Sequence, residues 1–116
     1  MPLNIRIDGD VVILSSFGRL MNDPRYVDAG RDVRSLLDQG RRNFVLDLSG
    51  VHETGASLLG VLLTVTRQIR QYGGETALAH LSPDTRSFIE KMQLDDYWDI
   101  FKNVEEAREF FQRGPT

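Results

Sequence analysis

The side chains that could take part in catalysis are few in this sequence, and they do not form a catalytic set. The chain contains two histidines, His52 and His80, and no cysteine. Neither histidine lies at a metal-ligand spacing from other histidines and carboxylates. Phosphate-binding glycine loops and nucleophile elbows are absent as well. We therefore expect a protein that is not an enzyme and that has no cofactor and no metal site, with His80 inside a strand and His52 in a loop.

Ser57 is the hydroxyl residue with the most informative surroundings. It follows a polar loop at residues 49–56 and precedes an apolar segment that begins with Leu58 and Leu59. A hydroxyl at a helix N-terminus can cap free backbone N–H groups. A phosphate on the same hydroxyl would lie near those donors and near the positive end of the helix dipole. The pattern is compatible with a simple capping serine and with a regulated one.

The spacing of the hydrophobic residues predicts strands that alternate with helices. Strands are expected at residues 3–8, 11–15, 43–48 and 75–81, and residues 100–101 are compatible with a short further strand. Helices are expected at residues 24–39, 57–72, 83–92 and 103–112, from their apolar stripes and flanking residues. This order indicates an α/β fold with a mixed β-sheet of about four to five strands packed against helices.

Capping residues mark several of the expected helix ends. Asp23 followed by Pro24 is a typical helix start, because a carboxylate caps and proline suits the first helical position. Ser82 and Asn103 precede two further expected helices, and Gly40 follows the first one. These residues support the helix boundaries independently of the hydrophobic spacing.

Length and composition indicate one folded domain, residues 1–116. The chain has a net charge of −3 and 41% hydrophobic residues, which argues against disorder and against a nucleic-acid-binding module. The longest apolar segment, 57–65, is interrupted by Gly60 and Thr64 and is too short to cross a bilayer. The first ten residues contain no long apolar run that would indicate a secretory signal. We therefore expect a cytoplasmic protein without membrane insertion.

Three long segments resemble the STAS domain, the family of bacterial anti-sigma factor antagonists, also called anti-anti-sigma factors. They read FGRLMNDPRYVDAGRDVRSLLDQGRRNFVLDLSG, VLDLSGVHETGASLLGVLLTVTRQIRQYGG and LSPDTRSFIEKMQLDDYWDIFKNVEEA, and together they cover nearly the whole chain. The resemblance implies a mixed sheet packed against helices and a role in transcription regulation by partner switching. In that mechanism an unphosphorylated antagonist binds an anti-sigma factor, often also a serine kinase, which inactivates the antagonist by phosphorylating a loop serine. A serine phosphatase restores it.

The resemblance also implies a position for the phosphorylated serine. Aligned without gaps, the Asp-Ser-Ser-Gly-like loop of the family places its acid on Gly55, its first serine on Ala56 and its phosphoacceptor on Ser57. Its glycine falls on Leu58. Thr54 is the backup acceptor. The acceptor hydroxyl is thus retained in this sequence, whereas the acid and the glycine of the motif are replaced.

In proteins of this family, the kinase binds at the N-terminal end of the helix that begins near the phosphoacceptor serine and at the adjacent loops. The expected partner-binding residues are Met21, Asn22, Asp23, Glu53, Thr54, Gly55, Ala56, Ser57 and Leu58. Phe17 and Leu20 either contact the partner or pack into the core. The expected partners are an anti-sigma factor/serine kinase and a serine phosphatase, not nucleic acid. The alternative is a divergent, non-phosphorylated STAS adaptor module in a signalling scaffold or transport complex.

Overall fold

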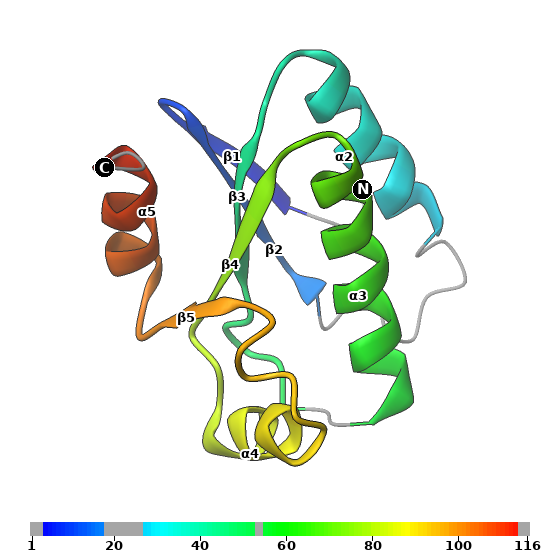
Figure 1. The fold of residues 1–116 in the computed structure, drawn as a ribbon, viewed down its shortest axis with the longest axis vertical. Helices are drawn as coiled ribbons and strands as arrows, with labels where there is room; N and C mark the ends of the chain where they lie inside the picture. The colour runs from blue at the N-terminus through cyan, green and yellow to red at the C-terminus, as the bar shows by residue number, and fades with distance from the viewer. Residues whose placement is uncertain (1–3, 18–26, 53–54, 114–116) are drawn as a thin grey trace.

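The computed structural model describes residues 4–17, 27–52 and 55–113, which form alternating strands and helices (Figure 1). The elements are β1 (Asn4–Asp8), β2 (Val11–Ser15), α2 (Val27–Asp38), β3 (Asn43–Asp47), α3 (Ala56–Gln71), β4 (Glu75–Ala79), α4 (Pro83–Lys91), β5 (Asp99–Phe101) and α5 (Val104–Gln112). Every strand and helix that the hydrophobic spacing predicts is present. The expected start of the first helix at Asp23 and Pro24 lies outside the described residues.

The strands form a single mixed sheet in the order β1-β2-β3-β4-β5. β1 and β2 are antiparallel, and the other neighbouring pairs are parallel. The register places Val12 beside Phe44 and Leu46 beside Leu78. Because side chains alternate along a strand, these residues share one face of the sheet. The predicted α/β fold with a mixed sheet is confirmed.

The larger part of the core lies on the face of the sheet that α2 and α3 cover (Figure 1). The strands contribute fully buried residues such as Leu14, Phe44 and Leu46, and α3 contributes Leu62 and Ile69. The apolar breadth of α3 therefore reflects burial against the sheet and against α2.

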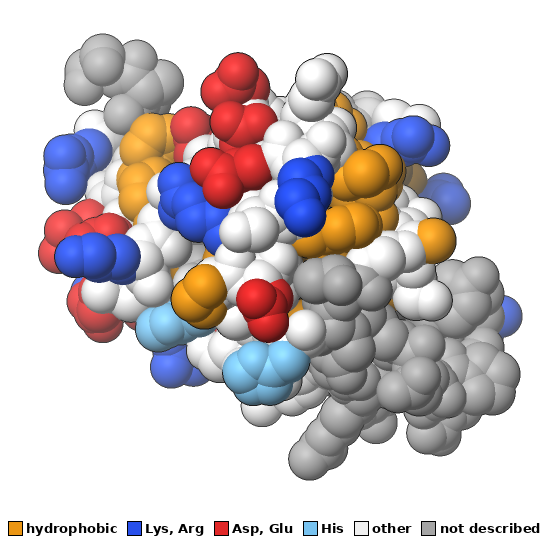
Figure 2. Space-filling model, turned by 90° about the horizontal axis from the view of Figure 1, so that it is seen from below, with side chains coloured by type: hydrophobic (Ala, Val, Ile, Leu, Met, Phe, Trp, Pro, Cys, Tyr) orange, Lys and Arg blue, Asp and Glu red, His pale blue; other side chains and the backbone are white. Residues whose placement is uncertain are grey.

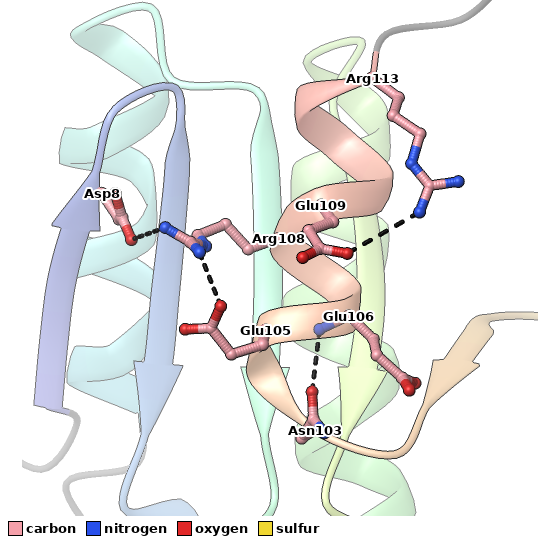
Figure 3. A network of polar contacts seen from close by, with 7 residues as sticks. All are labelled: Asp8, Asn103, Glu105, Glu106, Arg108, Glu109 and Arg113. Carbon is pink, nitrogen blue, oxygen red and sulfur yellow. Dashed lines mark hydrogen bonds and ion pairs between the residues drawn. The ribbon is translucent and has the colours of Figure 1, made fainter.

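The opposite face of the sheet packs against α5 (Figure 1). Its core residues include Val45 and the small side chains Ala77 and Ala79 of β4, which face Ala107 of α5. Figure 3 shows how Arg108 extends from α5 to Asp8 at the end of β1, with 3.1 Å between Nη1 and Oδ2. The hydrogen bond to Glu105 and the charges of Glu105 and Asp8 raise the pKa of Arg108. The ion pair between Arg108 and Asp8 thus connects helix α5 to the edge strand β1.

Two of the predicted caps are confirmed, and one local prediction is wrong. The Thr85 N–H donates to Ser82 Oγ at 3.1 Å, and the Glu106 N–H donates to Asn103 Oδ1 at 2.9 Å. His80 was expected inside a strand, but β4 ends at Ala79 and His80 has a φ of 60°. The strand stops there because the left-handed φ of His80 turns the chain out of the extended conformation.

Candidate functional site

The candidate site lies in the connection from β3 to α3, at the carboxyl ends of the parallel strands. Asp47 closes a tight turn here, because its Oδ1 accepts hydrogen bonds from Ser49 N at 3.0 Å and Ser49 Oγ at 2.6 Å. Gly50 follows with a φ of 78°. Val51 is then buried in the core. The first half of the loop is therefore anchored to the sheet before the chain reaches α3.

Helix α3 begins at Ala56, and its N-cap is Gly55 with a φ of 116° and no side-chain capping bond. The interpretation of Ser57 as a capping serine is therefore wrong, because Ser57 is the second residue of the helix. A capping side chain must precede the helix to reach its free N–H groups. Glycine is accepted at the N-cap position, and this was the only signal in the sequence that pointed to Gly55.

Ser57 is exposed, as is its neighbour Ala56. The Ser57 hydroxyl forms no hydrogen bond with another described residue. The first intrahelical bond of α3 joins Leu59 N to Gly55 O at 3.2 Å. The N–H groups that precede Leu59 in the helix thus lack a helical acceptor, and the first turn of α3 has no acidic residue. An anion on Ser57 would face these donors and the positive end of the helix dipole.

Leu58 differs from its neighbours because it points into the core. Only 1% of its surface is exposed, and it belongs to the same cluster as Leu48 and Val51. The buried Leu58 therefore holds the first turn of α3 to the core, and Leu59 packs against the same cluster, while Ala56 and Ser57 remain on the surface. Leu58 was expected among the partner-binding residues, but its side chain is buried in the core and is not available to a partner. It instead positions the predicted acceptor.

The remaining predicted contact residues fall into two groups. Met21, Asn22, Asp23, Glu53 and Thr54 lie outside the described residues, as does Leu20. Phe17 is fully buried in the main core, which supports core packing over partner contact for this side chain.

Both histidines are on the end of the molecule that Figure 2 presents. His52 lies in the β3–α3 connection and His80 directly after β4, and both are exposed.

Within residues 4–17, 27–52 and 55–113, no three His, Asp or Glu side chains gather where they could hold a metal ion. None of the helices described in these ranges is long and apolar enough to cross a membrane.

The fold and the site together define a class of protein: a small α/β domain that presents a serine hydroxyl at the first turn of a helix. The family model of the STAS domain matches residues 4–107. The chain therefore belongs to the STAS domain family, and the resemblance read from the sequence is confirmed.

Similar proteins include candidate and established anti-sigma factor antagonists. BtrV, a candidate anti-sigma factor antagonist of Bordetella bronchiseptica, is 29% identical over 85 residues, which cover 73% of this chain and 72% of BtrV. The crystal structure of a candidate anti-sigma factor antagonist from Thermotoga maritima, TM1081, is 25% identical with a TM-score of 0.78, covering 96% of this chain and 95% of that one. The phosphorylated form of Bacillus SpoIIAA shares the fold, with a TM-score of 0.66, 15% identity and coverage of 94% and 98%.

Proposed function

We propose that this protein is an anti-sigma factor antagonist that acts by partner switching. In its unphosphorylated form it binds an anti-sigma factor, which is also a serine kinase, and so releases a sigma factor. Family membership supports this function, as do the names of BtrV and TM1081. We also propose that residues 1–116 form one domain, that the protein catalyses no reaction itself and that it works in the cytoplasm. The docking surface includes the exposed first turn of α3 and the adjoining loops.

The proposed switch is phosphorylation of Ser57, and the exposed hydroxyl at the second position of α3 is the observation that carries it. A phosphate adds a charge of about −1.5 to −2 at neutral pH. The free N–H groups of α3 favour that charge, so the fold is retained. A partner packed on the same surface must desolvate the phosphate, which opposes binding. Phosphorylation therefore weakens the complex, and a serine phosphatase restores it.

The test is phosphorylation by the cognate kinase, followed by mapping of the site and titration of each variant. Ser57→Ala is expected to bind the kinase constitutively and to take up no phosphate. Ser57→Asp is expected to bind the kinase more weakly than the parent does. The loss of affinity is expected to be smaller than that of the phosphoprotein, because a carboxylate carries less charge than a phosphate. Thr54→Ala is the matched control and is expected to behave as the parent. Phosphate uptake by Ser57→Ala equal to that of the parent would exclude Ser57 as the acceptor.

A second candidate function is a non-phosphorylated adaptor in a signalling scaffold or transport complex. The observation that favours it is Leu58, which stands where the family motif has glycine and is anchored in the core. A fixed first turn restricts how far Ser57 can approach a phosphoryl donor. In this case a stable complex forms with a partner, no kinase labels the parent protein, and Ser57→Asp binds that partner as well as the parent does.

A further inference from the structure

Three phenylalanines meet where β5 joins α5, on the face of the sheet opposite α3. The ring centroids of Phe101 and Phe110 are 5.2 Å apart, and those of Phe110 and Phe111 are 5.3 Å apart. Phe101 and Phe111 pack against the smaller core beneath α5, whereas Phe110 is 41% exposed. We call these three residues the aromatic corner. Its outermost ring is a large apolar surface that the fold itself leaves partly uncovered.

The aromatic corner lies at an open edge of the molecule. β5 is the last strand of the sheet, and its one paired neighbour is β4. An edge strand leaves one side of its backbone without a strand partner. Phe101, at the end of β5, therefore lies beside a surface that another chain can reach.

The net negative charge of the chain comes from the segment that includes this corner. Residues 95–113 carry six carboxylates and three Lys or Arg side chains, and the remaining residues carry eleven of each. The whole negative excess of the chain, −3, thus comes from the segment that contains β5 and α5. An uneven distribution of this kind attracts a partner of the opposite charge.

Several of these carboxylates are exposed and unpaired. The side-chain carboxylates of Asp95, Asp96 and Asp99 form no hydrogen bond or ion pair with another described residue. Asp99 and Phe101 lie two residues apart on β5, so their side chains share the face that α5 covers. Figure 2 shows acidic side chains gathered at the top of that view, with both basic and hydrophobic side chains beside them. Asp99 therefore places an exposed, unpaired carboxylate on the same face of the sheet as the aromatic corner.

We propose that the aromatic corner docks a lysine- or arginine-rich segment of a partner protein. An apolar side chain of that segment packs against Phe110, and its cations lie near Asp99. This surface is separate from Ser57, because α5 and α3 cover opposite faces of the sheet (Figure 1). One molecule can therefore hold the basic segment and an anti-sigma factor at the same time.

The test uses a synthetic peptide that repeats Lys-Leu-Lys-Val, with Glu-Leu-Glu-Val as the control peptide. Binding of the basic peptide is measured by fluorescence anisotropy, and its site is mapped by amide shifts of the nitrogen-15-labelled protein. The expected shifts are concentrated in β5 and α5. The affinity is expected to fall as salt is raised from about 0.05 M to about 0.5 M, because screening weakens exposed charges. The acidic peptide is expected not to bind.

Matched variants separate a specific surface from general attraction to an acidic protein. Phe110→Ser is expected to weaken peptide binding by about tenfold, as truncation of an interface aromatic does. Ile7→Ser is its control, since Ile7 is 46% exposed on the opposite edge strand. Asp99→Lys is expected to weaken binding more than Asp38→Lys, which makes the same charge change at the end of α2. Circular dichroism checks that each variant is folded, and Phe110→Ala replaces Phe110→Ser if the latter unfolds.

Three results would overturn the proposal. The first is a set of peptide shifts centred on the first turn of α3, or spread over the surface. The second is an affinity that Phe110→Ser and Ile7→Ser change equally. The third is self-association of the chain, measured by light scattering and abolished by Phe110→Ser, which would assign the aromatic corner to a second copy.

Discussion

The hydrogen bond between Trp98 and Thr66 permits a quantitative test of the main core. Trp98 Nε1 donates to Thr66 Oγ1 at 2.9 Å, and the two residues are 32 positions apart. Trp98 is 4% exposed and Thr66 is fully buried. Thr66→Val keeps the shape of the side chain and removes the acceptor. The indole N–H then remains buried without a partner, which costs about 1–3 kcal/mol of the free energy of unfolding.

The expected loss is large enough to measure, because the free energy of unfolding of a domain of this size is about 5–15 kcal/mol. Guanidinium unfolding followed by circular dichroism measures it, and the fluorescence of Trp98, the single tryptophan, provides a second probe. Thr64→Val is the matched control on the same helix, because Thr64 is exposed. Its expected effect is within about 0.5 kcal/mol.

A double-mutant cycle separates the hydrogen bond from general effects of the substitution. In a Trp98→Phe background there is no indole N–H, so Thr66→Val is expected to cost less than about 0.5 kcal/mol. The reasoning fails if Thr66→Val costs the same with and without the indole. It also fails if Thr66→Val is as harmless as Thr64→Val in the parent protein.

Three further substitutions test the fold by thermal unfolding. Gly74→Ala is expected to destabilise by about 1–3 kcal/mol, because an added Cβ would lie 2.6 Å from Arg42 O; a neutral result would contradict the close approach. Gln93→Gly is expected to stabilise by up to about 1 kcal/mol, because Gln93 has a φ of 59°; a loss of stability would refute this reason. Arg108→Met is expected to lower the melting temperature only slightly, and less at high salt, because its ion pair with Asp8 is partly exposed; a large, salt-independent loss would point to packing instead.

Much of the fold follows from local patterns in the sequence. Two continuous apolar runs predicted strands β2 and β3. The broad apolar segment after Ser57 predicted a buried helix. Ser82 and Asn103 marked helix starts that the structure confirms. These features are readable because strand period, helix period and capping depend on residues within a few positions of one another.

The candidate site could be predicted only in part. The family resemblance identified the segment around Ser57, and the exposed hydroxyl at that position agrees with it. The role of Gly55 as the N-cap was not predicted, because its φ of 116° depends on how the anchored loop meets α3. The burial of Leu58 was equally unpredicted, since Leu58 and Leu59 follow each other in one apolar run.

Only the tertiary structure decided which distant residues meet. The sequence by itself determined the strands, the helices and the excess of acidic residues towards the C-terminal end. It did not determine that α5 covers the second face of the sheet, that Arg108 reaches Asp8, or that Trp98 donates to Thr66. These contacts join residues 32 and 100 positions apart. They depend on the order of the strands and on the face against which each helix packs, which no local pattern encodes.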